Sequence, residues 1–113
     1  MRVEIYQVDY EADPHHMMFR CFAAFEKQFG GRVPAEIYTQ VFDGELEVSC
    51  PEQVFVMFNT NHPARYTGRS LSMSDVVEFV DEGVFYFCDM IGFKRVRFAH
   101  ECKKGGCCDD CME

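Results

Sequence analysis

Three serines alternate with apolar residues in the run of residues 69–75, RSLSMSD. In an extended conformation Ser70, Ser72 and Ser74 lie on one face, where their hydroxyls can bond to a ligand or to backbone groups. Arg69 and Asp75 add one charge of each sign to this candidate binding surface. The alternative is a polar loop edge whose side chains satisfy neighbouring backbone groups, and the sequence leaves both interpretations open.

No base accompanies these serines in the sequence. A serine becomes a nucleophile only when a base takes its proton, and the chain has no Gly-x-Ser-x-Gly elbow. His62 and His100 can reach the serines only through distant folding, so we exclude a serine hydrolase. The remaining polar groups, Ser72, Asp75 and Asp89, have no spacing typical of a catalytic site. We therefore expect a protein that is not an enzyme.

Four of the seven cysteines crowd into residues 100–113. Zinc takes four thiolate or imidazole ligands in a tetrahedron, and Cys108-x-x-Cys111 has the spacing of a zinc knuckle. A zinc ribbon has two separated pairs of this kind, whereas this segment has one. A zinc site and a flexible cysteine-rich terminus both stay open, and no other cofactor is expected. The candidate ligands are His100, Cys102, Cys107, Cys108 and Cys111.

The composition is that of a single packed domain: 113 residues, 48% hydrophobic and 15% aromatic. The sequence contains no run of about 18 apolar residues, the length that a membrane-spanning helix requires. Residues 1–11 lack the apolar core and cleavage site of a signal peptide. We therefore expect a cytoplasmic protein without membrane contact, and the odd number of cysteines fits free thiols in that compartment.

The net charge of −8 is concentrated in the first half, where residues 1–60 hold ten acids and four bases. An acidic surface repels phosphate, which disfavours binding to nucleic acid. The basic strip of Lys94, Arg95 and Arg97 is the exception, and we interpret it as a solvated strand face. The expected partner is another protein with a basic surface.

Apolar periodicity predicts two helices. The first is expected from Asp13 as N-cap to Phe29, with Pro14 at its first position and Gly30 and Gly31 as its stop. Its core-facing stripe consists of Met18, Phe22, Phe25 and Phe29. The second follows a capping box of Ser49 and Glu52 and runs to about residue 58.

Alternation of apolar and polar residues predicts five strands, at 2–9, 36–47, 76–80, 84–88 and 94–98. The second is expected to end at the Asp43-Gly44 turn signal. Residues 81–83 form a hairpin with Gly83 in the left-handed conformation, and residues 90–93 form a bend. The predicted fold is α+β, in the order β-α-β-α-β-β-β, with a mainly antiparallel sheet and two helices packed on it.

The block after residue 68 resembles the YodL-like domain family, a group of small bacterial domains. The matching stretches are residues 68–77 (GRSLSMSDVV) and 86–94 (YFCDMIGFK), and the resemblance extends upstream to Phe42-Asp43-Gly44 and Asn59-x-x-His62-Pro63. It covers about two thirds of the chain. The family's Asp-Ser-Phe-Gly-Phe is replaced here by residues 89–93, DMIGF. The resemblance implies genes carried on conjugative or other mobile elements, and it implies no known reaction.

We therefore predict a non-enzymatic interaction module of residues 1–99, followed by a cysteine-rich tail of residues 100–113. One alternative is a zinc-binding regulator that acts through the tail. The other is an acidic protein that mimics the charge of DNA and occupies a host defence protein. The candidate binding residues are Arg65, Tyr66, Arg69, Ser70, Ser72, Ser74, Asp75, Gly92 and Phe93.

Overall fold

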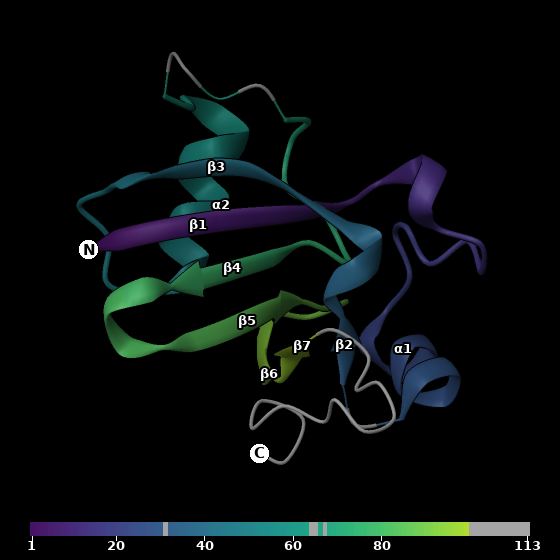
Figure 1. The fold of residues 1–113 in the computed structure, drawn as a ribbon. Coiled ribbons are helices and arrows are strands. Elements are labelled where there is room, and N and C mark those ends of the chain that lie inside the picture. Colours follow the sequence, from purple (N-terminus) through teal and green to yellow (C-terminus); the bar gives the residue numbers. More distant parts are fainter. Residues whose placement is uncertain (31, 64–65, 67, 100–113) are drawn as a thin grey trace.

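The computed structural model of the chain describes residues 1–30, 32–63, 66 and 68–99 (Figure 1). The strands are β1 (Arg2–Val8), β2 (Val33–Pro34), β3 (Tyr38–Glu45), β4 (Val76–Phe79), β5 (Val84–Cys88), β6 (Phe93–Val96) and β7 (Phe98–Ala99). The α-helices are α1 (Phe22–Phe29) and α2 (Pro51–Thr60). Three short 3-10 helices, η1 (Tyr10–Ala12), η2 (Ala35–Ile37) and η3 (Val80–Glu82), connect them. Neither α-helix of the described residues is long and apolar enough to cross a membrane.

One five-stranded sheet organises the fold, in the order β3-β1-β4-β5-β6. All four of its strand pairs are antiparallel. A small second sheet pairs β2 with β7 in parallel. The predicted α+β class and the mainly antiparallel sheet are therefore confirmed. The N-terminal strand β1 lies inside the sheet, between two strands from later in the sequence.

The two faces of the sheet carry separate cores, because side chains alternate along each strand. The face covered by α2 buries Val3, Ile5, Val77 and Phe79 against Val54 and Phe58. The opposite face buries Val8, Val76 and Phe87 against Phe25 and Met17. Figure 1 shows α2 behind β1 and β3, with α1 apart from it beside β2. Both predicted helices thus pack on the sheet, one on each face.

Helix α1 starts at Phe22, so the prediction of a helix from Asp13 is wrong. The Asp13 carboxylate does accept backbone N–H groups, but from Met17 at 2.8 Å and Met18 at 3.0 Å, which closes a loop. His16 has φ 55° and Phe19 has φ 69°, conformations that a right-handed helix cannot contain. The end of the helix is as predicted, since Gly30 follows it with φ 76°.

Several element boundaries also differ from the prediction. Strand β3 passes through Asp43-Gly44 to Glu45, because both residues pair with β1, and the turn signal there is overridden. The N-cap of α2 is Cys50, with Pro51 next, and Ser49 instead donates its backbone N–H to Gln53 Oε1 at 2.7 Å. The predicted strand 94–98 is two strands, β6 and β7, in different sheets.

The region around β5 matches the prediction most closely. Strand β5 has the predicted bounds, and Gly83 before it adopts φ 67° in the left-handed region. The predicted bend also forms: the Asp89 N–H donates to the Gly92 carbonyl at 3.0 Å, and Gly92 has φ 71°. This bend and the loop before β4 meet α2, and together they form the site described next.

Candidate functional site

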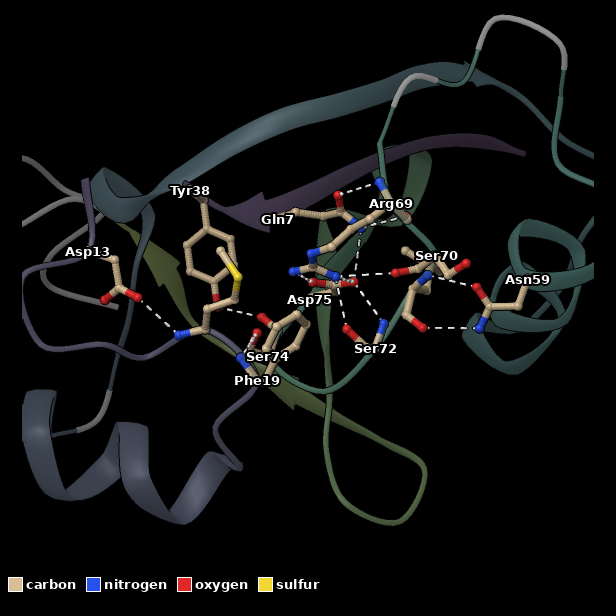
Figure 2. A network of polar contacts seen from close by, with 12 residues as sticks. Gln7, Asp13, Phe19, Tyr38, Asn59, Arg69, Ser70, Ser72, Ser74 and Asp75 are labelled. Atoms are coloured by element: carbon tan, nitrogen blue, oxygen red, sulfur yellow. Dashed lines mark hydrogen bonds and ion pairs between the residues drawn. The ribbon is translucent and has the colours of Figure 1, made fainter. Parts of the chain in front are cut away.

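Asp75 is a fully buried carboxylate immediately before β4. Arg69 binds both of its oxygens, with Nη2 2.8 Å from Oδ1 and Nη1 3.0 Å from Oδ2. The Ser72 backbone N–H donates to Oδ2 at 2.8 Å, and Gln7 Nε2 donates to the same oxygen at 3.1 Å. Figure 2 shows these donors converging on Asp75. The protein itself therefore supplies the hydrogen bonds that a buried carboxylate requires.

Gln7 joins this ion pair to the central strand β1. The two Nε2 hydrogens are shared among three acceptors, because Nε2 also lies 3.0 Å from the Arg69 carbonyl oxygen and 3.1 Å from the Tyr66 hydroxyl. The Tyr66 hydroxyl in turn donates to the Arg69 carbonyl. A Cβ on Gly68 would lie 2.6 Å from the Tyr66 hydroxyl and 2.8 Å from Gln7 Oε1. The glycine of the predicted motif is therefore required by close packing.

Ser74 holds the other end of the loop in a strained conformation. It is fully buried with φ 85°, and its Oγ accepts the backbone N–H of Phe19, itself at φ 69°. The left-handed region costs an L-residue about 1–2 kcal/mol, so both residues need external support. The Tyr38 hydroxyl supplies part of it by donating to the Ser74 carbonyl at 2.6 Å. The Arg69 guanidinium supplies more, with Cζ 4.7 Å from the centre of the Phe19 ring.

The serine hydroxyls do not share one face, because the loop turns where an extended strand was expected. The Asp75 N–H donates to the Ser72 carbonyl at 3.1 Å. The Ser72 Oγ accepts from Arg69 Nη1 at 2.9 Å, whereas the Ser74 Oγ faces Phe19. Ser70 is exposed, and its carbonyl accepts from Arg69 Nη1 at 3.2 Å. The interpretation as a loop that satisfies its own backbone and charges fits these contacts better than a row of ligand-facing hydroxyls.

Burial raises the pKa of the Asp75 carboxyl from 3.8 to about 6, although the hydrogen bonds and charge of Arg69 oppose the shift. Between about pH 4 and about pH 6 the folded state then binds more protons at this site than the unfolded chain does. The contribution of Asp75 to the free energy of unfolding therefore falls as the pH rises through this window. The group is ionised at neutral pH, where it depends on its donors.

We expect this linkage to be measurable by urea unfolding of the wild type and Asp75→Asn. The free energy of unfolding of the wild type, relative to that of the variant, should fall by up to about 3 kcal/mol between about pH 4 and about pH 6. The amide of the variant cannot titrate, so the change with pH in the difference between the two proteins reports the titration of Asp75. A difference between the two proteins that stays constant with pH would contradict the raised pKa.

Asn59 clamps the same loop to helix α2. Its Nδ2 donates to the Leu71 carbonyl at 3.0 Å, and its Oδ1 accepts the Leu71 N–H at 2.7 Å. Figure 2 shows Asn59 and its two hydrogen bonds to the loop beside the Asp75 network. Leu71 is 3% exposed, so its side chain is fixed at the edge of the core. The loop of residues 69–75 is thus held from both sides, by Asn59 on α2 and by Gln7 on β1.

An apolar groove of about 550 Å³ opens between α2, this loop and the bend after β5. A volume of this size is typical of ligand and peptide sites. Its apolar lining consists of Phe55, Val56, Leu71, Met73, Met90 and Phe93. The candidate binding residues Ser72, Gly92 and Phe93 therefore line one hollow, although the sequence did not indicate that they would meet across α2. Another hollow, of about 610 Å³, lies beside residues 45–49 and lacks such a continuous apolar lining.

The rim of the groove exposes large apolar side chains. Val56 is 59% exposed, Met90 70% and Ile91 92%. Ile91 adjoins Met90 at the tip of the bend. Methionine adapts its shape to different partners and is frequent at protein-binding surfaces. Apolar groups concentrated around one hollow are typical of a docking surface.

Three polar side chains of the groove have defined states or contacts. Burial raises the pKa of the Cys88 thiol to about 12, so it stays protonated and weakly reactive at neutral pH. The Ser72 hydroxyl accepts from a guanidinium, which cannot act as a base. Asp89 accepts the N–H groups of Phe22 at 3.0 Å and Met90 at 2.8 Å through Oδ1. It thereby supports the first residue of α1, whose own N-cap Cys21 makes no side-chain bond.

The other predicted site residues have different placements. Tyr66 is 6% exposed and packs its ring against Phe58 and Phe42, in the core, where it does not present a surface to a partner. Arg65 lies outside the described residues, as do all five candidate zinc ligands, His100, Cys102, Cys107, Cys108 and Cys111. Within the described part of the chain, no three histidine, cysteine, aspartate or glutamate side chains gather as a metal site requires.

Comparison with known proteins identifies one family. A family model described as "YodL-like domain" matches residues 2–98, which extends the resemblance well beyond two thirds of the chain. The match spans both helices, all of the central sheet and the groove. Searches of curated proteins and of solved structures find no match.

Proposed function

We propose that this chain, which belongs to the YodL-like domain family, is an interaction module that binds another protein through the groove beside α2. The observation that carries the proposal is the continuous apolar lining of that groove together with the exposed rim of Val56, Met90 and Ile91. In water these side chains contribute favourable free energy only when a partner covers them. The module acts by docking, without a reaction of its own.

The rigid frame around the groove supports this proposal. Loop 69–75 is fixed through Asn59 and through the buried ion pair of Arg69 and Asp75. A wall that is already ordered loses little conformational entropy when a partner binds, which favours affinity. The same contacts argue against catalysis, since the Ser72 hydroxyl is bonded to Arg69, and neither Ser72 nor Ser74 contacts a histidine within the described residues.

The groove proposal predicts that partner capture depends on the apolar rim. Val56→Asp and Met90→Asp each place a charge where the partner's apolar surface must dock, so recovery of bound protein should fall by about tenfold or more. Both positions are exposed, so the free energy of unfolding should change by about 0.5 kcal/mol or less. The measurement is affinity capture from a lysate of the source cells, with quantification of the recovered proteins.

Tyr10→Asp serves as the matched control, because Tyr10 is 76% exposed and does not line the groove. It adds the same charge to an exposed apolar side chain elsewhere and should leave recovery unchanged. Equal recovery with all three variants would sink the proposal that the groove is the docking site.

Ionic strength distinguishes this mode of binding from mimicry of DNA. A partner held by an apolar groove should remain bound at high salt, whereas one that reads the chain's net charge of −8 should be released. Capture that disappears at high salt would favour the charge mimic.

The family resemblance implies genes on mobile elements. We propose that setting for the partner as well, which would be encoded by the same element or by its host.

A further inference from the structure

Two acidic side chains line the groove, and neither is paired with a base among the residues that the structure describes. Glu52 is exposed in the first turn of α2 and makes no hydrogen bond or ion pair with a described residue. Asp89 uses Oδ1 for the two backbone N–H groups of Phe22 and Met90, while its Oδ2 accepts none from the described residues. Each acid therefore has acceptor capacity that no described residue fills.

Within the described part of the chain, no base lines the groove to compensate them. The charged members of this described lining are Glu52 and Asp89. Lys94, the base next to Phe93 in the sequence, lies on the other face, with Nζ 5.2 Å from the centre of the Phe22 ring. Arg69, near the loop wall, is already neutralised by Asp75. The groove is thus apolar in its lining and negative at its charged groups.

This charge distribution decides between possible occupants. A second copy of the chain would bring acid against acid in a symmetric contact, and two molecules of net charge −8 repel each other. Nucleic acid is repelled for the same reason. A protein segment that carries apolar residues with an adjacent base satisfies both the lining and its acids.

We propose that the groove binds a protein segment whose apolar side chains are accompanied by a lysine or arginine directed at Glu52 or Asp89. This inference rests on the proposed function, because it specifies the partner of the same groove. The apolar contacts supply most of the affinity, and the charge pairs select among apolar segments. Exposed ion pairs are individually weak, so each acid should change affinity by about threefold.

Selection from a library of displayed random peptides against the full chain tests this inference. Peptides that depend on the groove are those that bind the wild type and fail to bind Val56→Asp. We expect this group to be enriched in apolar residues next to lysine or arginine, relative to the unselected library. Asp89→Asn keeps the Oδ1 acceptor for Phe22 and Met90 and removes only the charge, and Glu52→Gln does the same at an exposed position.

Anisotropy measurements on selected peptides then measure the charge pairs. Each of the two variants should weaken binding by about threefold. Replacement of the peptide's base by glutamine should weaken binding by a similar factor. When this replacement is combined with the variant that lacks the acid paired with that base, the loss of affinity should be no larger than for either change alone. Groove-dependent peptides without basic enrichment, or with the same affinity for Glu52→Gln and Asp89→Asn as for the wild type, would overturn the inference and leave the proposed function intact. A selection that yields no peptide dependent on Val56 would overturn the proposed function itself.

Discussion

Asp75→Ala should lower the free energy of unfolding by about 3–5 kcal/mol at neutral pH, since removal of one partner of a buried ion pair leaves the other uncompensated. The side chain is fully buried and accepts from Arg69, Ser72 and Gln7. Its loss leaves the Ser72 N–H without its acceptor and removes one of the three acceptors of Gln7 Nε2. Arg69 keeps part of its hydration, because its side chain is 30% exposed.

Urea unfolding at neutral pH measures this effect, with Glu82→Ala as the control. Glu82 is exposed and makes no hydrogen bond with a described residue, so its replacement should change the free energy of unfolding by about 0.5 kcal/mol or less. A double-mutant cycle with Arg69→Ala isolates the pair, and a coupling of about 1–3 kcal/mol is expected. If the free energy of unfolding of Asp75→Ala lies within about 1 kcal/mol of that of the wild type, the network does not hold the loop as described.

The same variant links the network to docking. Loop 69–75 carries Leu71, Ser72 and Met73, which form one wall of the groove. When Asp75 is lost, the Ser72 N–H and the Arg69 guanidinium lose the carboxylate that they bind, although Gln7 still binds the Arg69 carbonyl and Asn59 still binds Leu71. Arg69 therefore acts on the groove indirectly. As a predicted binding residue, Arg69 positions the loop wall and does not need to contact the partner.

Local signals predicted the elements whose ends depend on local contacts. Strand β5 follows a left-handed glycine, and α2 starts at a proline, so nearby residues alone determine both starts. Helix α1 shows the opposite case. The stripe from Met18 to Phe29 does pack against the core, yet Met18 reaches it from a loop. Long-range bonds to Ser74 and Asp89 stabilise Phe19 and Phe22, and neither bond has a local signature.

The site was predictable only in part for the same reason. The importance of the 69–75 run could be inferred from its composition, and the alternative of an internally satisfied loop was already apparent. Gln7, which donates to Asp75 and helps to satisfy the loop, lies 68 residues before it and resembles an ordinary strand residue in the sequence. The groove needs three segments, from α2, the loop and the bend, and the exposure of Val56 becomes apparent only when they are assembled.

Two phenylalanines three positions apart on α2 separate stability from docking. Phe58→Ala should lower the free energy of unfolding by about 3–5 kcal/mol, because it opens a cavity in the core. Phe58 is 1% exposed, and its ring centre lies 4.8 Å from that of Tyr66 and 5.0 Å from that of Phe42, both in edge-on contact. Neighbours held by such aromatic contacts cannot collapse far into the space it leaves.

Phe55→Ala is the matched substitution on the groove side of the same helix. Phe55 is half-buried, lines the groove and has its ring centre 6.2 Å from that of Phe93. Its replacement should lower the free energy of unfolding by about 1–2 kcal/mol. Recovery of the partner should fall by about tenfold, because Phe55 is part of the groove. Phe58→Leu, which retains most of the volume and keeps the chain folded, should lower stability by about 1–2 kcal/mol and leave recovery near that of the wild type. The comparison uses urea unfolding and affinity capture on the same preparations. If recovery follows stability across all three variants, the groove has no role apart from the fold, whereas a loss confined to Phe55→Ala assigns docking to this face of α2.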